Sequence, residues 1–104
     1  MTGHKDNIQS LLFENSGRFL ISAGADKRIL VWDIASGHLV ADLFGPHTDT
    51  IFTLSVNKTT EGVILGSGGL DNKVVLWDLQ ALLDDIEIEE LTPTSMPAIK
   101  YVFI

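Results

Sequence analysis

Two seven-residue stretches of this sequence are nearly the same: Lys27–Asp33 reads KRILVWD, and Asn72–Asp78 reads NKVVLWD. Their tryptophans lie 45 positions apart, and the same offset pairs Ser22 with Ser67, Gly24 with Gly69 and Asp26 with Asp71. Upstream the offset is 43, pairing His4 with His47, Ile8 with Ile51 and Leu11 with Leu54. A period of this length indicates that one supersecondary unit occurs twice.

The change of offset has a definite place in the sequence. Between Phe13 and Gly17 the first copy reads ENS, whereas between Val56 and Gly62 the second copy reads NKTTE. Two residues added inside a strand would break its pairing, but a hairpin turn absorbs them at little cost. We therefore expect the insertion to lie in a turn.

Each copy consists of short apolar segments separated by turn residues. In the first copy the apolar segments are NIQSLLF, FLISAG, ILVWDI and LVADLF, and the turns between them are NSGR, ADKR and ASGH. Segments of this length, rich in branched and aromatic residues and interrupted by Gly, Asn, Asp and Ser, are typical of strands joined by hairpins. The pattern predicts four strands per copy.

The strand that ends each seven-residue phrase is apolar at successive positions. Ile29, Leu30, Val31 and Trp32 show no alternation, although neighbouring side chains of a strand point to opposite faces. This strand is therefore predicted to be buried on both faces. Four-stranded blades stacked around an axis provide such burial, because each blade lies between two others.

The signature residues of the repeat are Gly3-His4, Ser22, Asp26 and Trp32-Asp33, followed by Gly45, His47, Ser67, Asp71 and Trp77-Asp78. Both copies resemble WD repeats, the blades of β-propellers. The resemblance implies an all-β fold: a WD-repeat β-propeller fragment with two four-stranded antiparallel blades plus the start of a further strand. Because propellers have about four to eight blades, we expect the remaining blades of a parent propeller to cover the open faces.

The expected organisation follows the repeat. Residues 1–44 are assigned to one blade, 45–78 to the inner three strands of a second, 79–97 to an acidic helical or loop extension, and 98–104 to the start of a further blade strand. The extension has Leu79, Leu82, Leu83 and Ile86 at helical spacing. Acidic residues crowd its far end, which disfavours a helix there, so an extended linker is the alternative.

The resemblance also implies a structural hydrogen-bond chain in each blade. In the family the Trp indole bonds to the Ser hydroxyl, the Ser to the His, and the His to the turn Asp. By position, these chains are Trp32-Ser22-His4-Asp26 and Trp77-Ser67-His47-Asp71. Such chains satisfy buried polar groups and fix the geometry of a blade.

WD-repeat proteins often contact partners through the loop after each His and the residue before each turn Asp. Carried over by position, this implied partner-binding face comprises Lys5, Asn7, Ala25, Thr48, Thr50 and Leu70. None of these is an aromatic or arginine residue of the kind that dominates interface energies, so this part of a propeller is expected to act more as scaffold than as hot spot.

A narrower resemblance rests on GHKDNIQSLLFENSGRFLISAGADKRILVWDIASG, HTDTIFTLSV and GGLDNKVVLWDLQALLDD. These phrases are similar to the last blades of the TBP-associated factor 5 family, the WD-repeat subunit of TFIID and SAGA. The resemblance implies a nuclear scaffold in RNA polymerase II transcription initiation, with histone-fold subunits as partners. A WD-repeat adaptor of another complex, such as a ubiquitin-ligase substrate receptor, is the alternative.

The composition argues against several other classes of function. Fourteen acidic and seven basic residues give a net charge of −7, which disfavours direct nucleic-acid binding. No apolar run is long enough for a membrane span. There are no cysteines, and the three histidines, His4, His38 and His47, are accounted for by the repeat or by a turn, so we expect neither a metal nor a cofactor.

Ser22, His4 and Asp26 also invite a hydrolase hypothesis. However, a catalytic serine needs a strained exposed turn such as G-x-S-x-G and an oxyanion hole, and Ser22 lies in ISAG. An active site duplicated in both repeats would also be unusual. The sequence therefore favours a non-enzymatic protein.

Overall fold

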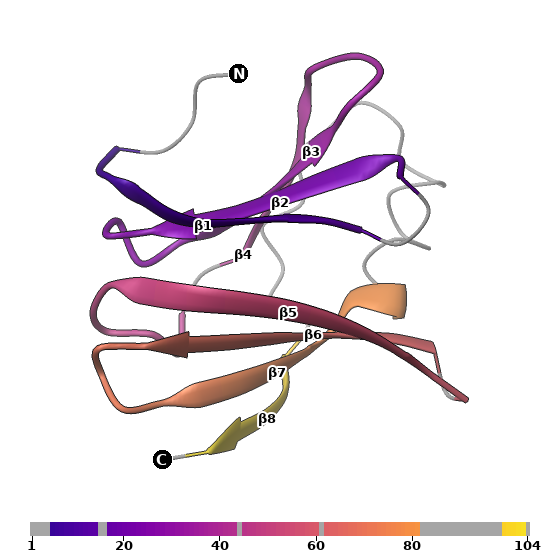
Figure 1. The fold of residues 1–104 in the computed structure, drawn as a ribbon. Helices are drawn as coiled ribbons and strands as arrows, with labels where there is room; N and C mark the ends of the chain where they lie inside the picture. The colour runs from indigo at the N-terminus through magenta and orange to yellow at the C-terminus, as the bar shows by residue number, and fades with distance from the viewer. Residues whose placement is uncertain (1–4, 15–16, 44, 61, 82–98, 104) are drawn as a thin grey trace.

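The chain forms two antiparallel β-sheets, which lie one above the other in Figure 1. The computed structural model describes residues 5–14, 17–43, 45–60 and 62–81 and the backbone of residues 99–103. The first sheet contains, in order, β1 (Ile8–Phe13), β2 (Phe19–Gly24), β3 (Ile29–Asp33) and β4 (Leu39–Leu43); the second contains β5 (Ile51–Thr59), β6 (Gly62–Gly69), β7 (Val74–Asp78) and β8 (Ile99–Phe103). The all-β class and the two four-stranded blades are confirmed.

The turns lie where the sequence places polar residues and glycine. Between β3 and β4, Gly37 adopts a φ of 73°, and its N–H donates to the carbonyl of Asp33 at 2.8 Å. Between β2 and β3, Lys27 has a φ of 68°, and the equivalent Asn72 has a φ of 62°. Asparagine adopts this left-handed conformation more readily than lysine does, so the second copy has the more suitable residue.

The two-residue insertion lengthens a hairpin instead of enlarging its turn. In the first sheet the β1–β2 ladder ends at the pair Phe13–Leu20. In the second sheet the equivalent pair, Val56–Leu65, is followed by three further pairs that end at Thr59–Gly62. The expectation that the insertion lies in a turn is therefore wrong, because three residues on each side, among them Asn57–Thr59 of the insertion, continue the ladder. The register of every earlier pair is unchanged.

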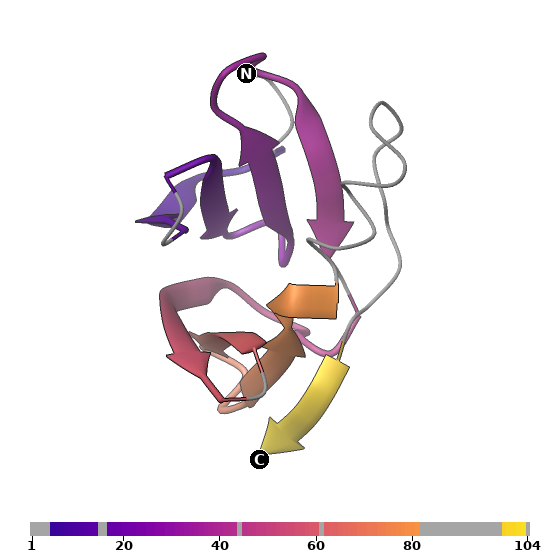
Figure 2. The same ribbon diagram turned by 90° about the vertical axis from the view of Figure 1, so that its right-hand side faces the viewer.

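The last strand corrects a second expectation. Residues 98–104 were expected to begin a further blade, but Ile99–Phe103 pairs antiparallel with β7 and completes the second sheet, with Val75 opposite Val102. Pairing with β7 satisfies backbone groups that would otherwise form an open sheet edge. Figure 2 shows β8, in yellow, at the side of the second sheet.

The main core lies between the two sheets. It is formed by apolar side chains that one face of each sheet turns toward the other, among them Ile21, Ala23, Val31, Leu54, Leu65, Val75 and Trp77. The predicted burial of both faces of β3 is confirmed, since Ile29, Leu30, Val31 and Trp32 are all buried. Stacking on the second sheet explains the burial of Ile29 and Val31, which belong to this core, whereas Leu30 and Trp32 lie on the opposite face of the first sheet.

Helical backbone begins at Leu79 and continues to Ala81, and the Leu79 side chain is fully buried in the core. The rest of the expected acidic extension, including Leu82, Leu83 and Ile86, lies outside the described residues. Within the described part of the chain, no helix is long and apolar enough to cross a membrane.

Candidate functional site

A chain of side-chain hydrogen bonds crosses the second sheet and ties β7 to the loop before β5. The indole N–H of Trp77 donates to Ser67 Oγ at 2.9 Å, and Ser67 Oγ lies 2.8 Å from His47 Nε2. The other ring nitrogen, His47 Nδ1, lies 3.0 Å from Asp71 Oδ2. These are the four residues expected from the repeat, brought together in the expected order.

The chemistry of these groups gives the chain a direction. An ionised carboxylate only accepts, so His47 Nδ1 carries the proton that points to Asp71. In the neutral imidazole Nε2 is then an acceptor, and the Ser67 hydroxyl donates to it while accepting from Trp77. Each of the four side chains thus has a partner suited to its role. Such a network specifies one arrangement of the sheet.

Asp71 also holds two backbone segments together. Its carboxylate accepts N–H hydrogen bonds from Thr48 at 2.9 Å and from Lys73 at 3.1 Å. Burial alone would raise the pKa of Asp71, but the hydrogen bonds from Thr48, Lys73 and His47 outweigh it and hold the pKa below its ordinary value. The ionised form is therefore the one that the folded state stabilises.

The first sheet repeats most of these contacts. Trp32 Nε1 donates to Ser22 Oγ at 2.9 Å, as Trp77 does to Ser67. Asp26 accepts N–H hydrogen bonds from Lys5 at 3.1 Å and Arg28 at 3.3 Å. The fourth expected member, His4, lies outside the described residues.

The geometry of Ser67 suits a structural role better than a catalytic one. A nucleophile has to reach a substrate, but Ser67 is only 2% exposed and His47 Nε2 lies against its hydroxyl inside the blade. No cluster of three or more potential metal ligands occurs among the residues that the structure describes. The Ser67 hydroxyl is therefore engaged by Trp77 and His47 within the blade.

The residues expected to meet partners lie at one end of the two sheets. Backbone hydrogen bonds join Ala25 N to Asn7 O at 2.8 Å and, at the equivalent place, Leu70 N to Thr50 O at 2.9 Å. In Figure 1 this is the left-hand end, where β1 and β5 begin. Lys5, Asn7, Thr48 and Leu70 are exposed there, whereas Ala25 and Thr50 are half-buried.

Two glycines, Gly24 and Gly69, are required at this end of the sheets. A Cβ on Gly24 would lie 2.0 Å from the carbonyl oxygen of Asn7, and one on Gly69 would lie 2.6 Å from that of Thr50. Lys73 Nζ also donates to the carbonyl of Pro46 at 2.8 Å, beside His47. In the sequence, the importance of these glycines is indicated by their equivalent positions in the two repeats, Gly24 and Gly69.

Comparison with known proteins supports the same family. The model described as "WD domain, G-beta repeat" matches residues 1–33 and 37–78. The chain is 35% identical over 79 residues to Mitochondrial division protein 1 of Neurospora crassa, and 31% identical over 80 residues to Eukaryotic translation initiation factor 3 subunit I of Emericella nidulans. These matches cover 76% and 77% of the chain but only 11% and 23% of the two relatives.

Proposed function

Since the chain belongs to the WD domain, G-beta repeat family, we propose that it is a non-enzymatic scaffold that presents propeller blades to other proteins. The observation that carries this proposal is the separation of two groups of residues. The hydrogen-bonded polar side chains of the second repeat lie inside the blade. At the end where β1 and β5 begin, hydrogen bonds hold the backbone in place, and side chains on this backbone are exposed to solvent.

The order of this end supports a binding role. Asp71 fixes the loop backbone at Thr48 and at Lys73, and Asp26 fixes the equivalent positions Lys5 and Arg28. Exposed side chains on a fixed backbone lose less entropy on binding than those on a free loop. The partner-binding face is thus preorganised by the carboxylates of Asp26 and Asp71.

The finer proposal is a place in the transcription factor TFIID or the coactivator SAGA, in the nucleus, with histone-fold subunits as partners. It is supported by the resemblance of the three phrases quoted above to the TBP-associated factor 5 family. The relatives matched by comparison carry other names, a translation initiation factor and a mitochondrial division protein. WD repeats are shared by all of these, so the assembly has to be tested by its partners.

Affinity purification of the tagged chain from nuclear and cytoplasmic extracts, followed by mass spectrometry, makes this test. We expect recovery of TFIID or SAGA subunits from the nuclear extract. Recovery of translation initiation factor 3 subunits, mitochondrial proteins or ubiquitin-ligase subunits in their place would contradict the transcription assignment and leave the scaffold proposal standing.

A pair of matched variants locates the binding face. Thr48→Arg adds a bulky charge at the end where β1 and β5 begin, whereas Thr60→Arg makes the same change at the far end of β5, and both threonines are exposed. We expect Thr48→Arg to reduce partner recovery about tenfold or more and Thr60→Arg to leave it unchanged. Equal recovery with both variants would remove this face from the proposal.

A further inference from the structure

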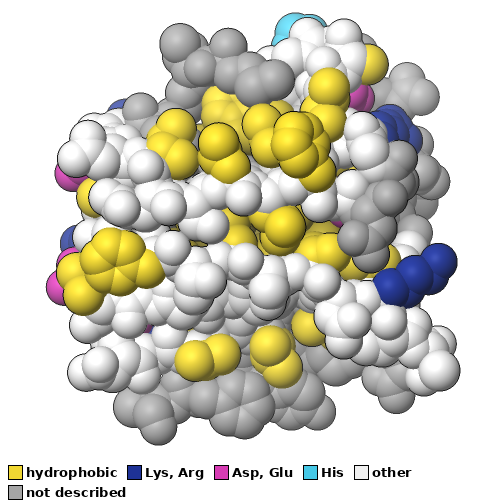
Figure 3. All heavy atoms as spheres, viewed as in Figure 1, with side chains coloured by type: hydrophobic (Ala, Val, Ile, Leu, Met, Phe, Trp, Pro, Cys, Tyr) yellow, Lys and Arg dark blue, Asp and Glu magenta, His cyan; other side chains and the backbone are white. Residues whose placement is uncertain are grey.

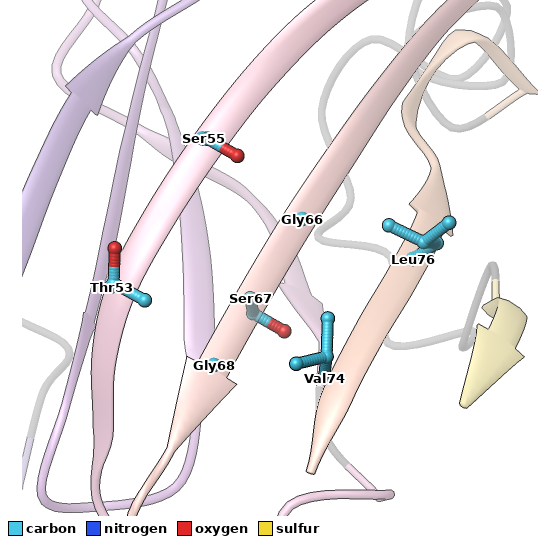
Figure 4. A pocket seen from close by; sticks show the side chains of 7 residues that line it. All are labelled: Thr53, Ser55, Gly66, Ser67, Gly68, Val74 and Leu76. Carbon is cyan, nitrogen blue, oxygen red and sulfur yellow. The ribbon is translucent and has the colours of Figure 1, made fainter. Parts of the chain in front are cut away.

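The second sheet carries a groove on the face that turns away from the first sheet. Figure 4 shows the groove along β6, between Thr53 and Ser55 of β5 and Val74 and Leu76 of β7, with a volume of about 180 Å³. In a propeller the next blade covers such a face, so the groove is assigned to blade packing. The ends of the sheets stay open in that arrangement, and a partner can reach them there.

The two repeats differ in chemistry at the end where β1 and β5 begin. Their acidic residues are the same, because Asp6 and Asp26 of the first repeat correspond to Asp49 and Asp71 of the second. Four neighbouring positions differ: Lys5, Gln9, Ala25 and Lys27 of the first repeat correspond to Thr48, Phe52, Leu70 and Asn72 of the second. The first blade is therefore the more basic at this end, and the second blade is the more apolar.

Phe52 and Leu70 form the apolar part of this end, being 46% and 54% exposed. Phe52 is the extra residue of a β-bulge, because Ile51 and Thr53 pair with successive residues of β6. The N–H of Leu70 donates to the carbonyl of Thr50 at 2.9 Å, which holds the β6–β7 turn beside the start of β5. Figure 3 shows hydrophobic side chains exposed at this left-hand end. Aromatic residues are enriched in protein interfaces, so Phe52 is suited to anchor a partner.

Lys5 and Lys27 form the basic part of this end, on the first blade. Lys27 lies in the β2–β3 turn, and the backbone N–H of Lys5 donates to Asp26 of the same turn at 3.1 Å. Within the described part of the chain, neither ammonium group has a partner, whereas the side chains of Arg28 and Lys73 are bonded to the chain itself. The two ammonium groups are therefore available to a carboxylate of a partner.

We propose that this end binds an extended protein segment in which an acidic residue and a large apolar residue lie about three positions apart. The acidic residue meets Lys5 and Lys27, and the apolar residue meets Phe52 and Leu70. β1 and β5 are neighbours, and stacked sheets lie about 10 Å apart, a distance that an extended chain spans with about three residues. The inference rests on the proposed scaffold function and specifies the chemistry of the partner.

The charges at this end favour a protein segment over single-stranded nucleic acid. Nucleic acid also combines negative charge with groups that stack on phenylalanine. However, it carries a phosphate at every nucleotide, and this end also presents four carboxylates, those of Asp6, Asp26, Asp49 and Asp71. A protein segment with one carboxylate needs only the two lysines.

Selection from a phage-displayed library of random peptides tests the proposal, with the tagged protein purified as it occurs in the cell. We expect the selected peptides to share an acidic residue about three positions from a large apolar residue. Affinity for the most enriched peptide is then measured by fluorescence anisotropy. Selected peptides that lack this pairing, or no peptide enriched above background, would overturn the proposal.

Matched variants locate the contacts of the enriched peptide. Phe52→Ser and Lys5→Gln are each expected to weaken its binding about tenfold. The controls, Phe13→Ser and Lys58→Gln, remove the same types of exposed side chain near the far ends of β1 and β5 and are expected to leave binding unchanged. Circular dichroism verifies that all four variants remain folded. Variants and controls with equal effects would contradict the proposed contacts.

Partner recovery in the affinity purification separates this inference from the proposed function. Recovery lowered by Thr48→Arg, Phe52→Ser and Lys5→Gln alike supports both. Recovery lowered by Thr48→Arg alone means that the end binds partners through other contacts, so only the inference fails. Recovery unchanged in all three variants removes both. Binding of oligothymidine as tight as that of the enriched peptide would assign this end to nucleic acid and overturn the inference.

Discussion

At the scale of single residues, one hydroxyl connects two aromatic rings of the second sheet. Ser67 Oγ bonds to both Trp77 Nε1 and His47 Nε2, and all three groups are buried. Ser67→Ala would leave an indole donor and an imidazole acceptor without partners. We expect it to lower the free energy of unfolding by about 2–4 kcal/mol, measured by urea denaturation with circular dichroism.

Ser55→Ala is the control for this change, because Ser55 lies on the neighbouring strand and is exposed. It is expected to alter the free energy of unfolding by less than about 0.5 kcal/mol. Equal effects of the two substitutions would contradict the structural importance of the hydrogen-bond chain.

Asp71 is expected to contribute to acid unfolding. Its pKa in the folded state is lowered from the ordinary value near 3.8, so between these two pKa values the unfolded state binds more protons. The contribution to stability is therefore complete above about pH 4–5 and is lost as the pH falls through the folded pKa. Urea denaturation at several pH values should show a decline below about pH 4 that is weaker in Asp71→Asn.

The exposed Asp49 serves as control for this pH dependence. Asp49→Asn removes a carboxylate of the same type from the loop between β4 and β5. We expect it to keep the acid-induced loss of stability seen in the unmodified chain. A decline that disappears in Asp49→Asn and persists in Asp71→Asn would contradict the assignment.

At the scale of strands, Gly24 allows the end of β2 to approach the start of β1. A Cβ there would lie 2.0 Å from a backbone oxygen, which cannot rotate away. We expect Gly24→Ala to lower the free energy of unfolding by about 3 kcal/mol. Gly68→Ala is the control, since its Cβ would meet only the Thr53 methyl at 3.1 Å. A similar loss in both variants, measured by urea denaturation, would contradict this explanation.

The strands that the sequence predicts well are those joined by short polar turns. The segments around NSGR, ADKR and ASGH formed hairpins, because turn residues set the register locally. Pairing of β8 with β7 was not predicted, since 20 residues from Leu79 to Ala98 separate them and no hairpin signal connects them. The longer β5–β6 ladder was not predicted either, because the sequence does not show which residues of the insertion pair across the two strands.

The candidate site also has a part that the sequence predicts and a part that it does not. His47, Ser67, Asp71 and Trp77 could be named from the repeat because each occupies a fixed place in its period. The groove could not, because it requires knowing that Ser55 lies opposite Gly66 and that Gly66 lies opposite Leu76. Such neighbours are set by register across three strands and not by spacing along the chain.

At the scale of the whole molecule, protection from solvent should rise from the edge strand β1 to the inner strands β2 and β3 of the first sheet. β2 and β3 are almost fully buried, whereas β1 alternates between exposed and half-buried residues. Local opening requires less free energy where fewer apolar contacts are lost. Hydrogen exchange with mass spectrometry should show slower amide exchange in Phe19–Asp33 than in Ile8–Phe13. Equal protection of both segments would contradict this order.

Each sheet contains a single tryptophan, and both indoles are buried and hydrogen-bonded to a serine at 2.9 Å. The molecule thus carries one tryptophan fluorophore per repeat, which excitation at the red edge of the absorption band selects over Tyr101. Trp32→Phe leaves emission from the second repeat alone, and Trp77→Phe leaves emission from the first. Comparing the two melting curves shows whether the repeats unfold together or one after the other. The difference between the two midpoints measures how strongly the contact between the blades couples their unfolding.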